Sequence, residues 1–159
     1  MPSFTHIDEK GSVRMVDVTD KAPTDRKAMA QGMIYMKPAT FRMIKNRKVK
    51  KVNVLETARI AGIMAAKNTS GIIPMCHPLN LTHVGIDFYP DEKASRIRIE
   101  ASVRLFGRTG VEMEALTAVS VAALTIYDMC KSHDREMTIS DICLIEKQGG
   151  KSGKFSREK

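Results

Sequence analysis

The sequence predicts an α+β fold in which two long helices cover one face of an antiparallel sheet. Two long segments place apolar residues at helical spacing, and four shorter runs are typical of strands. In chain order, the expected strands and helices span residues 29–36, 38–46, 53–68, 83–89, 95–106, 111–131 and 137–146.

The first half of the chain is expected to form one strand and two helices. Pro38 fits a first helical turn, so a short helix follows the first strand. Asn53 is a suitable cap for the next helix, with Glu56 placed as in a capping box, and Gly71 provides a natural stop. Between the two helices, residues 45–51 hold five Lys or Arg in or near a loop.

Two neighbouring runs in the second half predict a β-hairpin. Residues 83–89 alternate apolar and polar side chains, residues 90–94 form a turn, and residues 95–106 alternate again. The expected order of core elements is therefore strand, helix, strand, strand, helix, strand. This order is the ferredoxin-like βαββαβ arrangement, an antiparallel sheet with two long helices on one face.

The long helix at residues 111–131 is apolar on nearly all sides, which indicates that it is buried on all sides. One sheet cannot bury both sides of a helix. We therefore expect the free side to contact another subunit in a homo-oligomer.

The chain length of 159 residues suits one domain. We expect a partly flexible N-terminal arm at 1–25, a single domain at 26–148 and a basic, mobile tail at 149–159. In the arm, Val13 and Met15 share one side of an alternating patch, which fits either an edge strand or an ordered arm.

Charge and cysteine usage narrow the classes of partner and compartment. The formal net charge of +8 favours anionic partners without choosing among phosphate, nucleotide, nucleic acid and membrane surfaces. Three cysteines without CxxC spacing point to a reducing compartment. We find no signal-peptide pattern and no apolar segment long enough to span a bilayer, so we expect a cytoplasmic protein.

The loop between Pro74 and Pro78 displays Cys76 and His77 on a backbone that two prolines restrict. Such a loop fits a ligand-binding edge, and a structural histidine in a tight connection fits it equally well. The cysteines and histidines match no standard zinc spacing, so we expect no metal site.

The segment 107–114 leads a glycine-bearing loop into the long helix. Free N–H groups at a helix start bind anions, yet Thr109 and Glu112 also fit a capping box, which would be purely structural. Glu114 is harder to explain by capping. Its carboxylate matches the adjacent N–H donors of a guanine-type edge.

Asp128 and Lys131 share a face near the other end of the same helix. They fit an ordinary surface ion pair, or an acid/base pair in which neighbouring cations lower the pKa of the lysine. Lys51 and Lys147 are candidate phosphate ligands.

The length of the long helix separates these candidates. Glu114 and Asp128 are fourteen residues apart, which corresponds to roughly 21 Å along a helix. One small site cannot hold both groups from the same chain. If both serve one substrate, two copies of the helix must run antiparallel across a two-fold subunit boundary.

Four segments stand out as long motifs in a fixed order, namely residues 15–18, 73–79, 107–128 and 145–153. Together they resemble the cyclic pyranopterin monophosphate synthase family, also called the molybdenum cofactor biosynthesis protein C family. The resemblance covers about residues 10 to 153. Met75 replaces a common Leu, and Asn80 stands where Pro is frequent.

The resemblance implies the second step of molybdopterin synthesis. The implied substrate is 3′,8-cyclo-7,8-dihydroguanosine 5′-triphosphate, which is rearranged to a pyranopterin with a cyclic phosphate and release of pyrophosphate. The resemblance also implies a hexamer, as a trimer of dimers, with the site at the dimer interface. Mg²⁺ accompanies many triphosphates, but the sequence contains no dedicated metal cage, and we expect no required cofactor.

Site residues carry over by matching position. Asp128 is implied to be the principal acid/base residue, and Lys51 and Lys131 are implied to be acid/base or phosphate-contacting groups. The implied phosphate ligand is Lys147, and the segment 112–114 is the implied purine-recognition edge. The residues implied to bind substrate are Met75, Cys76, His77, Glu112, Met113, Glu114, Lys147, Arg26 and Arg108.

Two alternatives remain open at the level of sequence. A nucleic-acid-binding module of the same fold would use aromatic side chains on its sheet, and the expected strands offer few of them, such as Tyr89 and Phe106. A non-catalytic regulatory domain that binds nucleotide is the second alternative. It predicts that Asp128→Asn leaves biological activity intact.

Overall fold

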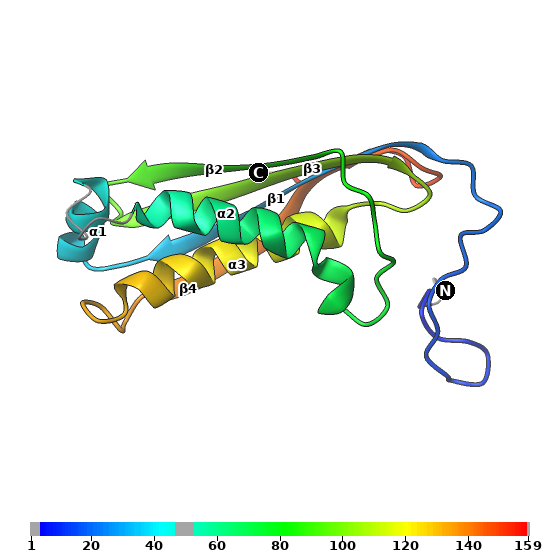
Figure 1. Ribbon diagram of the computed structural model, residues 1–159, viewed down its shortest axis with the longest axis horizontal. Coiled ribbons are helices and arrows are strands. Elements are labelled where there is room, and N and C mark those ends of the chain that lie inside the picture. The colour runs from blue at the N-terminus through cyan, green and yellow to red at the C-terminus, as the bar shows by residue number, and fades with distance from the viewer. Residues whose placement is uncertain (1–3, 47–52, 159) are drawn as a thin grey trace.

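A computed structural model describes residues 4–46 and 53–158 of the chain. Figure 1 shows α2 and α3 side by side along one face of a sheet, with α1 at one end of the sheet and the N-terminal arm at the opposite end. The elements are β1 (Thr24–Tyr35), α1 (Pro38–Lys45), α2 (Val54–Lys67), a short 3₁₀ helix (Thr69–Gly71), β2 (His83–Asp91), β3 (Arg96–Gly107), α3 (Glu112–Cys130), β4 (Thr138–Gln148) and β5 (Phe155–Ser156).

The five strands form one antiparallel sheet in the order β2-β3-β1-β4-β5. β1 and β3 pair without interruption from Thr24 opposite Gly107 to Tyr35 opposite Arg96. The pairing of β1 with β4 contains two register shifts. The expected α+β class, the antiparallel sheet and the hairpin are confirmed, and the strand order is consistent with the ferredoxin-like arrangement.

Alternate residues of the strands face the helices and form the core. On β1 the inward side chains are small, with Ala28 and Ala30 fully buried, which lets α3 lie close to the sheet. Gly62 of α2 allows an equally close approach between the helices. A Cβ atom there would lie 2.3 Å from Cδ1 of Ile86 and 2.9 Å from the carbonyl oxygen of Ala118.

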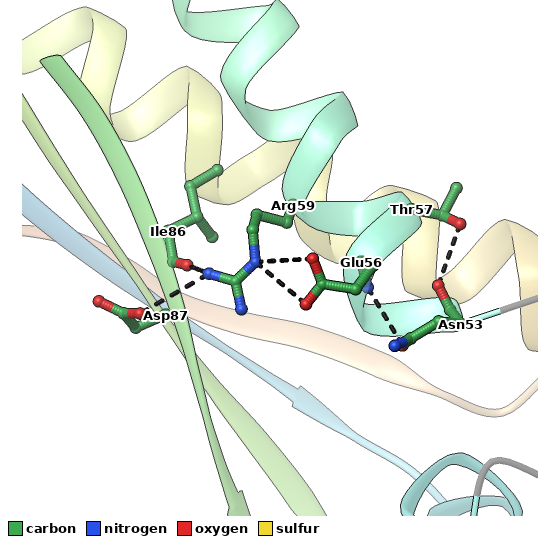
Figure 2. Close-up of polar contacts among 6 residues, drawn as sticks. All are labelled: Asn53, Glu56, Thr57, Arg59, Ile86 and Asp87. Atoms are coloured by element: carbon green, nitrogen blue, oxygen red, sulfur yellow. Dashed lines mark hydrogen bonds and ion pairs between the residues drawn. The ribbon is translucent and has the colours of Figure 1, made fainter.

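The start of α2 is held by a cap and by an arginine (Figure 2). The side chain of Asn53 accepts a hydrogen bond from the Glu56 amide at 3.3 Å, as predicted. The Glu56 carboxylate, expected to complete a capping box, instead accepts from Nε of Arg59 at 3.2 Å. Arg59 also donates to the Ile86 carbonyl and lies over the Phe88 ring, so it ties α2 to the edge strand β2.

The start of α1 is capped from a distant part of the chain. Lys37, its N-cap residue, makes no side-chain cap of its own. Asp134, in the turn between α3 and β4, accepts from the Lys37 amide at 2.8 Å, the Thr40 hydroxyl at 3.2 Å and the Glu136 amide at 3.1 Å. Asp134 is only 2% exposed, so this carboxylate anchors α1 to the end of α3 from inside the protein.

α3 is the central helix, and only one of its sides is free. Ala115, Ala118 and Val119 are fully buried, whereas Leu124 is 56% and Met113 is 37% exposed. Among the described residues, α3 is also the one helix whose length and hydropathy would allow a membrane span, contrary to the expectation that no segment reached that length. Its burial against the sheet and α2 accounts for that apolar composition.

The two ends of the chain differ from the expected boundaries. β1 begins at Thr24, two residues before the expected domain start. Among residues 4–23, the pairing is an isolated bridge between Ile7 and Val13, so the segment is an arm and not an edge strand. The expected tail contains β5, which pairs with β4. Mobility of the tail stays a prediction.

Candidate active site

A cavity of about 850 Å³ lies at the end of the sheet where β1 begins, where β3 and β4 end, and where α3 starts. Its walls come from the N-terminal arm, the loop before β2, the turn before α3 and the segment after β4. All nine residues expected to bind substrate line it, namely Arg26, Met75, Cys76, His77, Arg108, Glu112, Met113, Glu114 and Lys147.

Glu112 and Lys147 form an ion pair in the wall of the cavity. Oε1 of Glu112 lies 3.3 Å from Nζ of Lys147, and the two side chains are 29% and 22% exposed. The capping box of Thr109 and Glu112, which was one of two alternatives for this segment, does not form. Val111 is the N-cap of α3 without a side-chain cap, and the Thr109 hydroxyl donates to the Gly110 carbonyl at 3.1 Å.

Glu114 is the buried acid of the site, with 4% of its surface exposed. Burial raises the pKa of its carboxyl group to about 7, and the nearby charge of Glu112 adds to that effect. Burial also raises the pKa of the Cys76 thiol, with a contribution from the charge of Glu114. Glu114 therefore exchanges protons near neutrality, as general acids and bases do, whereas Cys76 stays a thiol.

Arg26 reaches the cavity from β1 and is fixed by two carbonyl oxygens. Its Nε donates to Gly107 and its Nη2 to Arg108, each at 3.3 Å. Gly150 packs against this guanidinium with a φ of 77°, and a Cβ atom there would lie 2.0 Å from Nη1 of Arg26. The positive φ favours glycine at position 150, and a larger residue there would also displace the guanidinium of Arg26. Arg26, Arg108 and Lys147 give this wall a positive charge.

The N-terminal arm forms a wall that residue spacing did not reveal. Val16, Val18 and Lys21 line the cavity. Asp17 accepts from the Thr19 amide at 2.8 Å, and hydrogen bonding to Thr19, followed by a smaller effect of the charge of His77, lowers the pKa of its carboxyl group. The arm therefore approaches the loop that carries His77.

Asp128 and Lys131, two of the three residues expected to be catalytic, do not line this cavity. Nζ of Lys131 donates to Oδ1 of Asp128 at 2.6 Å at the far end of α3, with 56% and 71% of the two side chains exposed. The helix thus separates them from Glu114, as its length predicted. Lys51 lies outside the described residues.

Of the two alternatives for Asp128 and Lys131, the structure of one chain shows the surface ion pair and not a lysine with a lowered pKa. Its hydrogen bond to Asp128 and the carboxylate charge raise the pKa of the ammonium group. Lys131 is therefore held as a cation by Asp128.

Other cavity residues were not identified as site residues from the sequence. Lys151 and Ser152 line the cavity, and the Ser152 hydroxyl accepts from Nζ of Lys147. The sequence feature that could have identified them is the glycine-rich run at 149–153, in which three glycines adopt positive φ. Within residues 4–46 and 53–158, no three His, Cys, Asp or Glu side chains form a group that could hold a metal ion.

Comparison with known proteins places this cavity within a family. A model of the MoaC family matches residues 15–150, which include β1 to β4 and most of the cavity lining. The chain belongs to the MoaC family.

Similar MoaC family members carry one name. A protein of Desulfatibacillum aliphaticivorans is 64% identical over 99% of both chains and is named cyclic pyranopterin monophosphate synthase. Proteins with the same name are 66% identical in Desulforapulum autotrophicum, over 98% of this chain and 95% of the relative, and 58% identical in Heliobacterium modesticaldum, over 99% of both chains. The family expected from the sequence motifs is confirmed.

Proposed function

We propose that this MoaC family member is a cyclic pyranopterin monophosphate synthase. It converts 3′,8-cyclo-7,8-dihydroguanosine 5′-triphosphate to cyclic pyranopterin monophosphate and pyrophosphate in molybdenum cofactor biosynthesis. The observation that carries the proposal is a single cavity with a cationic wall and a buried carboxyl group, in a chain whose relatives bear that name.

The cationic wall is the binding site for the triphosphate. Arg26, Arg108 and Lys147 neutralise the phosphates and the departing pyrophosphate, with Arg26 already oriented by two carbonyls. Glu114 faces the purine-derived ring, where its buried carboxyl group recognises N–H donors and transfers protons. Met75, Cys76, His77, Glu112 and Met113 complete the substrate contacts.

The catalytic residues Asp128 and Lys131 act on the substrate of a neighbouring subunit, and Lys51 is the third catalytic residue of the proposal. Two α3 helices pack antiparallel through the side that carries the exposed Leu124 and Met113, so that Asp128 and Lys131 of one copy reach the cavity of the other. Three such dimers form a hexamer. Asp128 is the principal acid/base residue, and the lysines hold phosphate or donate protons.

The proposal also includes the fold, the cellular compartment, the partners and the cofactor requirement of the enzyme. The domain is ferredoxin-like, with α2 and α3 as the two long helices. The enzyme is cytoplasmic and acts without a nucleic-acid or membrane partner. No cofactor is required beyond the Mg²⁺ that accompanies a triphosphate.

One structural feature weighs against the nucleic-acid alternative. Arg98 lies 4.1 Å from the centre of the Tyr89 ring, and Arg96 lies 5.8 Å from that of Tyr35. These aromatic faces are therefore already covered by arginines of the same chain. Phe88 packs against the core instead of facing outward. The sheet thus offers few free platforms for stacking bases.

Turnover of the cyclic nucleotide tests the proposed function. Purified protein is supplied with 3′,8-cyclo-7,8-dihydroguanosine 5′-triphosphate, and pyrophosphate release and pterin fluorescence after oxidation are followed. We expect both products in equal amounts. Asp128→Asn should nearly abolish both while the fold and oligomer persist. Absence of both products from the unaltered protein would refute the proposal, as would full activity of Asp128→Asn.

A further inference from the structure

The two carboxylates at the start of α3 have different electrostatic surroundings. Glu112 is neutralised by Lys147, whose Nζ lies 3.3 Å from its Oε1. Glu114 is buried more deeply and forms no ion pair with any described residue. The charge of Glu112 nevertheless acts on Glu114. The protonation state of Glu114 therefore depends on whether Glu112 remains paired with Lys147.

Lys147 is the cation that phosphate can remove from this pair. It belongs to the positive wall and also donates to the Ser152 hydroxyl, so its ammonium group is shared between two partners. Arg26, in contrast, is fixed on the carbonyls of Gly107 and Arg108. A polyphosphate carries more charge than one carboxylate and competes effectively for a half-buried lysine.

We propose that phosphate binding draws Lys147 away from Glu112, and that the Glu114 carboxylate then takes up a proton from the solvent. This inference rests on the proposed function, because it assigns the phosphates to the cationic wall. The step converts the ionised Glu114 carboxylate to a carboxylic acid, and the proton comes from water or buffer. Glu114 therefore becomes fully available as a proton donor for the ring chemistry only when the triphosphate is bound.

The physical basis is repulsion between two acids in one poorly solvated wall. With Lys147 gone, the charge of Glu112 is no longer compensated, and a second negative charge on Glu114 becomes more costly. The pKa of Glu114 is about 7 in the empty cavity, so ionised and protonated forms are both present at pH 7. Complete protonation therefore takes up a fraction of one proton per site.

Other charged or titratable groups face the same cavity and contribute to its potential. They come from the arm, the loop before β2, β1, the turn before α3 and the segment after β4. These groups are His6, Asp20, Lys21, Cys76, His77, Arg26, Arg108 and Lys151. Among the described residues, Lys147 is the one that forms an ion pair with Glu112, so its displacement has the largest effect on the two acids.

Calorimetry with inorganic pyrophosphate tests the inference. Binding to the full-length protein is measured at pH 7 in buffers of different ionisation enthalpy, which gives the number of protons taken up. Glu114→Gln removes the proposed acceptor at nearly constant volume. Glu56→Gln is the matched control, because Glu56 also pairs with a cation, Arg59 at 3.2 Å, but outside the cavity. Ionisation of pyrophosphate itself is common to all three proteins.

We expect the unaltered protein and Glu56→Gln to take up more protons per site than Glu114→Gln, by less than one full proton. Infrared spectra should show a protonated carboxyl band that grows on pyrophosphate addition only when Glu114 is present. Equal uptake by all three proteins, or no growth of that band, would overturn the inference. Absence of pyrophosphate binding would overturn it too. If the unaltered protein still turned over the cyclic nucleotide despite one of these results, only the inference would fail, and the proposed function would be unaffected.

Discussion

The buried carboxyl group of Glu114 contributes to the dependence of protein stability on pH. Its folded-state pKa of about 7 lies above the ordinary value of 4.5, so the folded state binds this proton more tightly than the unfolded chain. Stability from this group is present below pH 4.5 and is lost as pH rises through 7. Glu114→Gln removes this pH-dependent loss of stability, because a glutamine side chain does not titrate.

We therefore expect Glu114→Gln to gain stability relative to the unaltered protein as pH rises from 5 to 8. The upper limit is about 3 kcal/mol, and water in the open cavity reduces it. Urea unfolding at pH 5 and pH 8, at one protein concentration, measures the difference. If the difference in the free energy of unfolding between the two proteins were the same at both pH values, Glu114 would not be buried as an acid in solution.

At this scale the sequence predicted which residues share the cavity, but not how they pair. The motifs around His77, Glu112 and Lys147 located the cavity lining correctly. The partner of Glu112 was misjudged because a capping box needs only local spacing, whereas Lys147 arrives from β4. Likewise, the burial of Glu114 depends on strands that are distant in sequence.

Among the elements, α1 depends on a side chain from the other half of the chain. Asp134→Ala would leave the Lys37 amide and the Thr40 hydroxyl without their buried acceptor. We expect a loss of about 2–4 kcal/mol in the free energy of unfolding. Thr40→Val removes only one of the three bonds and should cost about 1 kcal/mol. Chemical denaturation of both variants checks this order, and similar small losses would contradict it.

Helix and strand boundaries were predictable where a local signal exists. Asn53 marks the start of α2 and alternation marks the hairpin, and both agree with the structure to within about two residues. The start of β1 was missed because Asp25 and Lys27 interrupt the apolar pattern while their backbone pairs with β3. The cap on α1 and the strand β5 had no local signal, since each depends on a distant segment.

For the whole molecule, α3 is the element on which the proposed dimer rests. Its first turn belongs to the cavity and its last turn carries Asp128, and one chain cannot bring these ends together. The exposed Leu124 lies between them on the free side. Leu124→Glu should therefore weaken the dimer, which analytical ultracentrifugation would detect, and lower turnover in parallel. Full turnover by a monomer would contradict a shared site.

Mixing two inactive variants tests the shared site directly. Glu114→Gln damages the cavity of its own chain, whereas Asp128→Asn damages the site to which its chain contributes. In a mixed dimer, one site combines both changes and the other contains neither. Random reassembly gives mixed dimers half of the time, so about a quarter of all sites should be intact. We expect the mixture, after subunit exchange, to recover about a quarter of the unaltered turnover, and each variant alone to show almost none. If the mixture stayed as inactive as its components, Glu114 and Asp128 would have to act from the same chain, which the length of α3 prevents, or not on the same substrate at all.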